Sequence, residues 1–271
     1  MVRPRALAAG LATLVGTTAT PTAAFQSLGG ACARIGQRSL TSLRPVVSSP
    51  RPRGSATAVT MNFWSSLTAK KEVNYEGLAG LPESFAKEAA TYALRGEIPT
   101  HSKDGHAIAT FAGGCFWGLE LAFQRVPGVV ATSVGYAQGH VEKPTYGEVC
   151  SGATGHTETV TLIYDEQAVD FETLCNVFWD RLGNDALRYH QVGADRGSQY
   201  RHGIYYNTEA QKAAADKTFQ ERQAAFGGRA IQTEIEPVGI AWPAEEYHQQ
   251  YLQKGGQSAK KTAVEPIRCY G

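Results

Sequence analysis

Acidic residues are absent from the first 71 residues of this 271-residue chain, whereas nine Lys and Arg residues occur there. The rest of the chain carries 17 basic and 25 acidic side chains, a net charge of −8, although the whole chain has a net charge of +1. A nucleic-acid-binding surface would need Lys and Arg clustered on the folded part. The distribution disfavours nucleic-acid binding and indicates a basic targeting leader ahead of a mildly acidic body.

Cys-x-x-Cys pairs and Cys/His clusters at zinc-ligand spacing are also missing. The five cysteines are scattered, at positions 32, 115, 150, 175 and 269. This pattern disfavours a structural zinc site and a secreted disulfide framework. We expect no bound metal or other cofactor, a reducing compartment, and one or two reactive thiols among inert ones.

Long apolar runs are absent as well. The stretch at 6–20 covers only about 15 residues, short of the roughly 20 that a spanning helix needs, so no membrane association is expected. Its basic start, apolar centre and small residues before Phe25 predict a signal peptide over 1–24, and the Ser-, Arg- and Pro-rich segment 25–60 predicts a transit peptide. The junction at Phe25 resembles bipartite plastid leaders of algae. A plastid is therefore expected, with a mitochondrion, or the cytoplasm after a start at Met61, as alternatives.

Globular patterning begins after an N-terminal extension at 61–100, and we expect one catalytic domain at 101–252 and a flexible tail at 253–271. Strand-like runs occur at 107–112, 129–136, 157–165, 203–206 and 231–238. Helical patterns occur at 116–126, at 171–182, after a capping box formed by Thr208 and Gln211, and at 244–252. Strict alternation in 157–165 predicts a half-buried strand. Amphipathic strands alternating with helices favour an α+β fold, a two-layer sandwich with antiparallel pairs.

Cys115 lies where a strand ends and a helix begins. The unpaired N–H groups and the dipole of a helix N-terminus stabilise a thiolate, so we expect the pKa of Cys115 to be lowered. Phe116 and Trp117 beside it could form an apolar wall for a small alkyl group. Phe116 also begins the apolar stripe of the helix, so core packing is an equal alternative for its side chain.

The run Gly113-Gly114-Cys115-Phe116-Trp117-Gly118 resembles the active-site signature of A-type peptide-methionine sulfoxide reductases. Further matching runs follow in the same order, and the resemblance covers about 107–252: Gly135-Tyr136, Pro144-Thr145-Tyr146, Glu148-Val149-Cys150-Ser151-Gly152, Thr154-Gly155-His156-Thr157-Glu158, Asp195, Gln199-Tyr200-Arg201 and Glu246-Tyr247-His248-Gln249-Gln250-Tyr251-Leu252. The resemblance implies a two-layer sandwich around a ferredoxin-like βαββαβ core. It also implies reduction of the S-epimer of methionine sulfoxide, free and in proteins, by a chain expected to be a monomer.

The resemblance assigns nucleophilic attack on the sulfoxide sulfur to Cys115 and proton donation to the sulfoxide oxygen to Glu158. Tyr146 and Tyr200 would donate hydrogen bonds to that oxygen. The alternation also places Glu158 on the apolar face of its strand, where desolvation raises the pKa of a carboxyl. A solvated carboxylate at a strand end is the alternative.

For the substrate, the resemblance implies that Phe116 and Trp117 hold its methyl group. Asp195 would orient a water or a polar group of the substrate. The segment 182–187 departs from the His-Asp-Pro-Thr run of many relatives, so the rim of the pocket could differ here.

Oxygen transfer would leave Cys115 as a sulfenic acid, which a second thiol must convert to a disulfide for turnover. Cys269 is the best candidate, since it follows a tail that could reach the site. Cys175 lies in an apolar helix stripe and is interpreted as an inert core thiol, and Cys150 as structural with a minor role left open. The C-terminal ending resembles the plant-type tail of relatives that carry two distal cysteines, but Ala263 stands where the additional Cys would be. We therefore predict one disulfide, Cys115 to Cys269, reduced by thioredoxin or, in an assay, by dithiothreitol.

Two other function classes remain open at this point. The chain could be a redox sensor that uses Cys115 as a switch, although a sensor needs no acid aimed at a sulfoxide oxygen. It could also be a Cys-His hydrolase with His156 or His248 as base, although no sequence feature brings either imidazole to the thiol.

Overall fold

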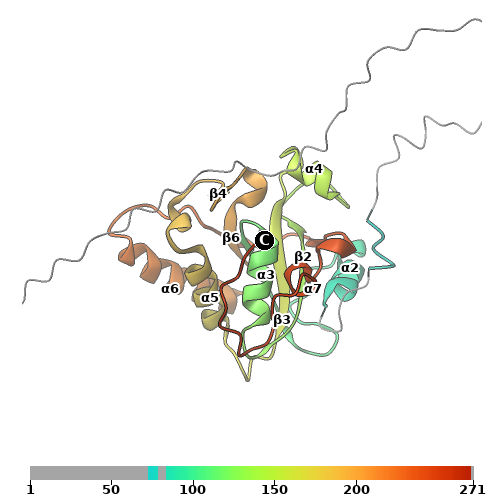
Figure 1. The fold of residues 1–271 in the computed structure, drawn as a ribbon, viewed down its shortest axis with the longest axis horizontal. Helices are drawn as coiled ribbons and strands as arrows, with labels where there is room; N and C mark the ends of the chain where they lie inside the picture. Colours follow the sequence, from blue (N-terminus) through green and yellow to red (C-terminus); the bar gives the residue numbers. More distant parts are fainter. Residues whose placement is uncertain (1–72, 79–83, 270–271) are drawn as a thin grey trace, which may run out of the picture.

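The computed structural model of the chain describes residues 73–78 and 84–269. The predicted signal peptide, transit peptide and alternative start Met61 lie outside these residues. Within them, the molecule is built around a mixed six-stranded sheet with helices packed against it (Figure 1). None of the described helices is long and apolar enough to cross a membrane.

Four strands, each antiparallel to its neighbours, form the centre of the sheet in the order β6-β1-β3-β2: β1 (Ala107–Gly113), β2 (Val129–Ala137), β3 (Thr157–Tyr164) and β6 (His202–Tyr206). α3 (Phe116–Gln124) connects β1 to β2, and α5 (Phe171–Leu182) follows β3. The predicted α+β fold with a βαββαβ core is therefore confirmed. β7 (Glu234–Pro237) extends the sheet parallel to β6, and β8 (Trp242–Pro243) pairs antiparallel with β2.

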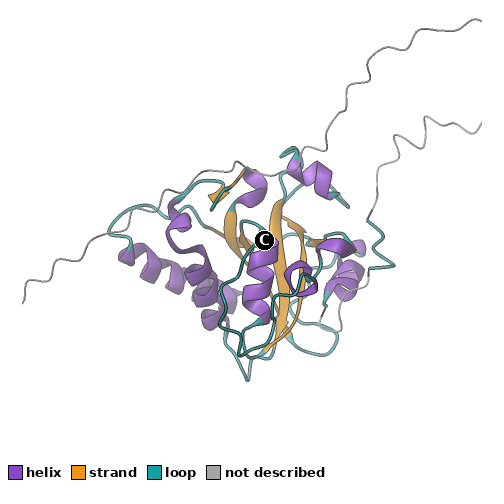
Figure 2. Cartoon of the chain, viewed as in Figure 1, coloured by secondary structure: helices purple, strands orange, loops and turns teal. Residues whose placement is uncertain are grey.

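One face of the sheet is covered by α3, α5 and α6 (Glu209–Ala225) (Figure 2). Phe111 of β1 lies at the centre of this layer, with its ring centroid 4.8 Å from that of Phe123 and 5.8 Å from that of Phe178. Alternation along β1 and β3 directs Val160 and Leu162 to the same face. Truncating a fully buried Phe of this kind costs about 3–5 kcal/mol of stability.

The predicted helix starts at 171 and 208 are both capped by side chains. Asp170 accepts a hydrogen bond from the backbone N–H of Thr173 at 2.7 Å, and Thr208 accepts one from that of Gln211 at 3.2 Å. The second half of the expected capping box is displaced by one residue, because the Gln211 oxygen accepts from the Asn207 N–H. The Gln211 amide also donates to the carbonyl of Ile108 at 2.7 Å, which attaches α6 to β1.

The opposite face is covered by α2 (Ala86–Leu94), which the sequence analysis left in the N-terminal extension. Phe85 and Ala89 pack against Ile108 and Ile163 on that face. β3 is consequently buried along its whole length, so the prediction of a half-buried strand over 157–165 was wrong. The alternation itself is present, but both of its faces are covered.

The helix predicted over 244–252 is divided into η3 (Glu246–His248) and α7 (Tyr251–Lys254), because Gln250 has a left-handed backbone with φ 49°. Gln249, fully buried, uses its side chain to bond β2: it accepts from the Val134 N–H at 3.0 Å and donates to the Val134 carbonyl at 2.8 Å. The side-chain amide thus continues the hydrogen bonding of the sheet where a helix was expected. The strand predicted over 231–238 is also shorter, as β7.

Beyond Gly255 the chain is held against α3, and the dark-red segment runs alongside that helix toward its N-terminal end (Figure 1). Arg125, which follows α3, donates to the carbonyls of Ser258 at 2.9 Å and Glu265 at 2.7 Å. Gln257 and Arg268 exchange two hydrogen bonds, at 2.6 and 3.0 Å. The tail predicted over 253–271 therefore returns to the helix that carries Cys115.

Candidate active site

Cys115 occupies the N-cap position of α3, immediately after β1. Gly114 before it has φ +74°, a left-handed conformation that favours glycine, and a Cβ there would meet the Val192 side chain at 2.5 Å. The backbone N–H of Trp117, in the first turn, bonds the Cys115 sulfur and lowers its pKa. The local sequence therefore places the thiol at the strand-to-helix junction, as expected.

The pKa of Cys115 is nevertheless raised, which reverses the expectation drawn from the helix N-terminus. The largest cause is a hydrogen bond with Cys269, followed by burial and by the negative charge of Glu158. These effects outweigh the Trp117 N–H. In this arrangement Cys115 holds its proton and shares it with the second sulfur.

Cys269 has the complementary environment. Its pKa is lowered to about 7, first because it accepts the hydrogen bond from Cys115 and also because of the charge of Arg181, whose Nη2 lies 3.2 Å from Sγ, while burial acts in the opposite direction. A Cβ added to Gly118 would overlap both this sulfur and Arg181. The two thiols that the sequence analysis paired are therefore in contact across the first turn of α3.

Glu158 lies at the start of β3 and is only 2% exposed. Its Oε2 accepts a hydrogen bond from the backbone N–H of Phe116 at 3.0 Å, which brings the carboxyl next to the residue that follows Cys115. Burial raises its pKa to about 8, with smaller upward contributions from Asp195 and Cys269, while the Phe116 N–H lowers it. The expected desolvated carboxyl is confirmed, and it keeps its proton at neutral pH.

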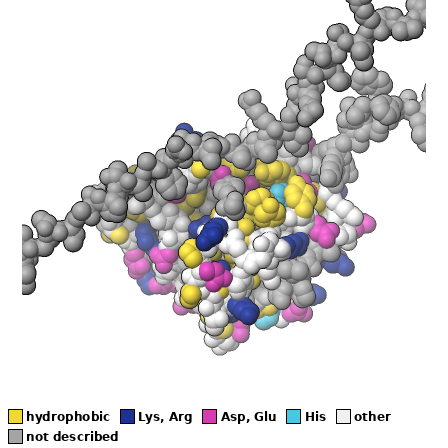
Figure 3. All heavy atoms as spheres, in the orientation of Figure 1, with side chains coloured by type: hydrophobic (Ala, Val, Ile, Leu, Met, Phe, Trp, Pro, Cys, Tyr) yellow, Lys and Arg dark blue, Asp and Glu magenta, His cyan; other side chains and the backbone are white. Residues whose placement is uncertain are grey.

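The aromatic residues of the signature differ in exposure. Phe116 is 1% exposed and belongs to the core, so its packing role is present. Trp117 is half-buried and stacks on Tyr251, with ring centroids 3.9 Å apart and an interplanar angle of 14°. Tyr247 is also exposed, and hydrophobic side chains gather on the face of the molecule that Figure 3 shows. Trp117 and the tyrosines of η3 and α7 thus form an aromatic surface next to the thiol pair.

Tyr146 is the first residue of α4 (Tyr146–Cys150), a short helix that the sequence analysis missed. Its signal was present, since Thr145 and Glu148 form a complete capping box. The backbone N–H of Tyr146 also donates to Glu245 at 2.9 Å. Its half-buried ring lies 4.7 Å from that of His248, centroid to centroid, which places it on the Trp117 side of the site.

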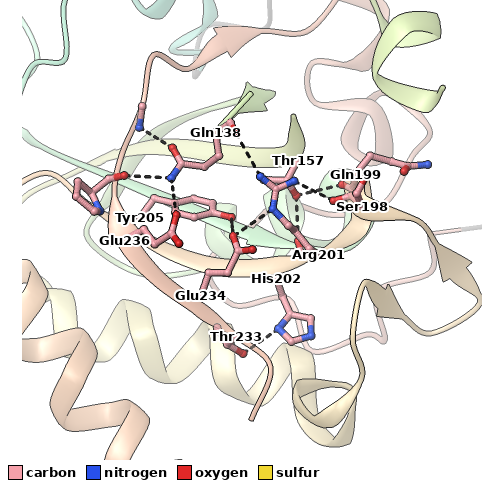
Figure 4. Close-up of polar contacts among 12 residues, drawn as sticks. Gln138, Thr157, Ser198, Gln199, Arg201, His202, Tyr205, Thr233, Glu234 and Glu236 are labelled. Atoms are coloured by element: carbon pink, nitrogen blue, oxygen red, sulfur yellow. Dashed lines mark hydrogen bonds and ion pairs between the residues drawn. The ribbon is translucent and has the colours of Figure 1, made fainter. Parts of the chain in front are cut away.

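Tyr200 ends η2 (Ser198–Tyr200) and is buried. Thr157 attaches this turn to β3, because its hydroxyl lies 3.1 Å from the carbonyl of Gln199 and 3.0 Å from that of Arg201. Arg201 in turn donates to Glu234 at 3.1 Å and to the Ser198 carbonyl at 3.0 Å (Figure 4). This polar network holds Tyr200 beside the strand residue that precedes Glu158.

Asp195 lies on β5 (Asp195–Arg196), which pairs with β4 (Gln191–Val192) in a hairpin after the 3-10 turn η1 (Gly183–Leu187). It is half-buried and close enough for its charge to raise the pKa of Glu158 and of Cys269. The residues predicted for the site are therefore gathered around the N-terminal end of α3, contributed by separate segments of the chain.

Two residues near the site make contacts that the sequence does not predict. Arg181 contacts Cys269, and no local pattern in α5 signals this, because the two positions are 88 residues apart. His248, proposed only as an alternative base, instead accepts a hydrogen bond from the Trp117 indole at 3.2 Å. His248 lies in the run from Glu246 to Leu252 that resembles the family, but no sequence pattern predicts its contact with Trp117, which depends on the fold.

The histidines give little support to the hydrolase alternative. Burial lowers the pKa of His248 to about 3 and that of His156 to about 4, which makes both weak bases at neutral pH.

Cys175 is fully buried, and burial raises its pKa to about 12. Both properties are consistent with the interpretation of Cys175 as an inert core thiol. Within residues 73–78 and 84–269, no group of three or more His, Cys, Asp or Glu could hold a metal ion.

A pair of hydrogen-bonded thiols beside a protonated carboxyl, on an α+β scaffold, is the site of a thiol-dependent oxidoreductase. Residues 107–269 match the family model described as peptide methionine sulfoxide reductase, so the chain belongs to that family. Its relatives place it among the A-type enzymes.

Individual relatives support this assignment. Peptide methionine sulfoxide reductase A2-1 of Oryza sativa is 49% identical over 183 residues, which cover 68% of this chain and 96% of the relative. Peptide methionine sulfoxide reductase A4, chloroplastic, of Arabidopsis thaliana is 43% identical over 203 residues, covering 73% and 78%. Among solved structures, Mxr1 from Saccharomyces cerevisiae in reduced form has a TM-score of 0.53 and 32% identity, covering 58% of this chain and 90% of its own.

Proposed function

We propose that this enzyme reduces the S-epimer of methionine sulfoxide, free and in proteins, to methionine, and so repairs oxidised methionine. The observation that carries the proposal is the position of the Glu158 carboxyl, buried, hydrogen-bonded to the Phe116 N–H and protonated at neutral pH, next to the Cys115 thiol. A thiol nucleophile beside a carboxylic acid suits a substrate whose sulfur must be attacked while its oxygen takes up a proton.

In the first step the Cys115 sulfur attacks the sulfoxide sulfur, and Glu158 gives its proton to the sulfoxide oxygen. Tyr146 and Tyr200 donate hydrogen bonds to that oxygen, and Trp117 with Phe116 holds the methyl group. Asp195 orients a water or a polar group of the substrate. The oxygen passes to Cys115, so methionine leaves with two electrons gained and Cys115 becomes a sulfenic acid. The raised pKa of Cys115 in the thiol pair means that it must release its proton to solvent before attack, and Glu158 regains a proton from solvent after donating its own.

In the second step Cys269 attacks the sulfenic sulfur. An S–S bond forms, the S–O bond breaks, and the oxygen leaves as water after taking up a proton. The contact between the two thiols supports this pairing. Thioredoxin, or dithiothreitol in an assay, then reduces the disulfide without any bound cofactor.

The test resolves the two sulfoxide epimers of a blocked methionine sulfoxide and follows each with dithiothreitol and then with thioredoxin as reductant. We expect loss of the S-epimer alone with both reductants. Failure to consume the S-epimer under either condition would contradict the proposal. Cys115→Ser should abolish the reaction with both.

Recycling is tested with Cys269→Ser and the matched control Cys150→Ser. Cys269→Ser should produce one equivalent of methionine but lose thioredoxin-supported turnover, whereas Cys150→Ser should keep both. A Cys269→Ser enzyme with a full steady-state rate on thioredoxin would rule out Cys269 as the resolving thiol.

We also propose a plastid as the site of action, on the basis of the leader over 1–60. The A4 relatives from Arabidopsis thaliana and Oryza sativa are named chloroplastic, which is consistent with it. A fluorescent protein fused behind residues 1–60 should accumulate in plastids. Fluorescence confined to mitochondria would refute this part of the proposal.

A further inference from the structure

Three parts of the chain fix the position of the Cys269 sulfur. Gly118 of α3 leaves space for the sulfur, since a Cβ there would overlap it. Arg181, the penultimate residue of α5, places Nη2 at 3.2 Å from Sγ. The tail that delivers the cysteine is anchored upstream by Arg125. The sulfur is therefore held at a defined point and not merely tethered near the site.

The charged and titratable groups that face this sulfur are mostly acidic. Cys115 bonds it from α3, Glu158 interacts with it from β3, and Asp195 faces it from β5. Arg181 from α5 is the cation that contacts it, by charge and by hydrogen bond. Burial and Asp195 oppose a negative charge on Cys269, whereas the hydrogen bond from Cys115 favours it most and the charge and hydrogen bond of Arg181 favour it next.

We propose that Arg181 is a positioning residue for the recycling step: its guanidinium holds the Cys269 sulfur as a thiolate against Gly118, directed at Cys115. The proposal rests on the proposed function of Cys269 as the resolving thiol. Cys269 then attacks the Cys115 sulfenic acid without first losing a proton. One S–S bond forms and one S–O bond breaks, Cys269 is oxidised as Cys115 is reduced, and the departing oxygen takes a proton from solvent to leave as water.

The size of the effect is limited, because Arg181 is exposed to solvent, which screens its charge. A thiol with a higher pKa is less ionised but a better nucleophile once ionised. Removing Arg181 should therefore slow disulfide formation by about two- to fivefold at neutral pH. At a pH where Cys269 is fully ionised in both the parent enzyme and the variant, the variant should form the disulfide no more slowly than the parent.

The experiment compares Arg181→Met, which removes the charge, with Arg181→Lys, which keeps it. Arg222→Met is the matched control, because Arg222 forms an exposed ion pair with Asp180, the neighbour of Arg181, at 3.0 Å. Each enzyme is given one equivalent of the S-sulfoxide without reductant, and disulfide formation is followed from pH 6 to 9.5. Alkylation of Cys269 by iodoacetamide is measured over the same range in a Cys115→Ser background, by mass spectrometry of the C-terminal peptide.

We expect Arg181→Met to move the midpoints of both pH profiles upward, Arg181→Lys to restore them in part, and Arg222→Met to match the parent enzyme. Unchanged midpoints in Arg181→Met would overturn the proposal. A deficit of the same size at every pH would also overturn it, since that is the result of a purely structural role.

Two outcomes distinguish the resolving role of Cys269 from the positioning role of Arg181. If Cys269→Ser keeps full thioredoxin-supported turnover, Cys269 is not the resolving thiol, and the role of Arg181 in recycling falls with it. If Cys269→Ser loses that turnover while Arg181→Met titrates like the parent enzyme, only the assignment of Arg181 fails.

Discussion

Replacing Glu158 by Gln removes the transferable proton at this position with little change in shape. The Gln oxygen can still accept from the Phe116 N–H, so the contact between β3 and the first turn of α3 is retained. A positioned general acid contributes about 10²- to 10⁴-fold to rate, and we expect the first turnover of Glu158→Gln to slow by at least about 100-fold near pH 7.

The pH dependence provides a sharper test. With its pKa raised to about 8, Glu158 is mostly protonated near pH 7 and mostly ionised near pH 9. The rate ratio of the parent enzyme to Glu158→Gln cancels the ionisation of Cys115 to a first approximation. It should fall by about tenfold between pH 7 and 9, because the acid is lost only in the parent enzyme. The Glu158 anion also raises the pKa of Cys115, so the parent enzyme loses thiolate as well, and the ratio should fall further.

The assay is rapid-quench measurement of methionine formed from the blocked S-sulfoxide in a single turnover, between pH 6 and 9.5. Glu221→Gln, an exposed substitution on α6, is the control and should follow the parent profile. A ratio that stays constant across this range would refute the assignment of Glu158 as the acid. So would a variant that reacts within threefold of the parent enzyme near pH 7.

Three further predictions follow from contacts around α3. Burial raises the pKa of Glu120 from 4.5 to about 8, so its contribution to stability is fully present below about pH 4.5 and is lost progressively as pH rises from there to about 8. Glu120→Gln, which keeps an acceptor for Thr132 and Gln250, should raise the free energy of unfolding by about 3 kcal/mol at pH 7 and by little at pH 4.5, as measured by urea denaturation. Gly118→Ala should slow formation of the Cys115–Cys269 disulfide more than it slows the first turnover, because its Cβ displaces the Cys269 sulfur; equal slowing of both steps would contradict this. Cys269→Ala should increase alkylation of Cys115 near pH 7, because it removes the largest cause of the raised pKa, and a slower alkylation would show that Cys269 does not hold the Cys115 proton.

The elements around Cys115 could be predicted because their signals are local. The apolar run that forms β1, the stripe from Phe116 to Phe123 and the Pro127-Gly128 stop all lie within a few turns of chain, and the structure has β1, α3 and β2 at these positions. Alternation likewise placed Glu158 on the same face of β3 as Val160 and Leu162, and from that its raised pKa followed. Side-chain period and backbone preference are properties of short segments, so the sequence expresses them directly.

Local sequence patterns do not predict the structure where contacts with distant parts of the chain decide it. The helix at 244–252 is divided at Gln250, whose backbone is left-handed, and the side chain of the preceding Gln249 bonds Val134 of β2. β3 is buried on both faces because α2 covers the second face. Neither contact leaves a periodic signal in the segment it changes.

The thiol pair also has features that the sequence predicts and features that depend on the tertiary structure. The sequence by itself determined that Cys115 stands at a strand-to-helix junction, within a run that resembles the family signature, and it predicted Cys269 as the partner thiol. Only the tertiary structure brings the two sulfurs together and so raises the pKa of Cys115. The helix N-terminus favours a thiolate on Cys115, but the hydrogen bond to Cys269, burial and Glu158 raise the pKa of Cys115. The pKa of Cys269 is lowered by the hydrogen bond from Cys115 and, to a smaller extent, by Arg181. A pKa is the sum of all nearby charges, hydrogen bonds and burial, and here those groups come from four separate segments that only the folded chain brings together.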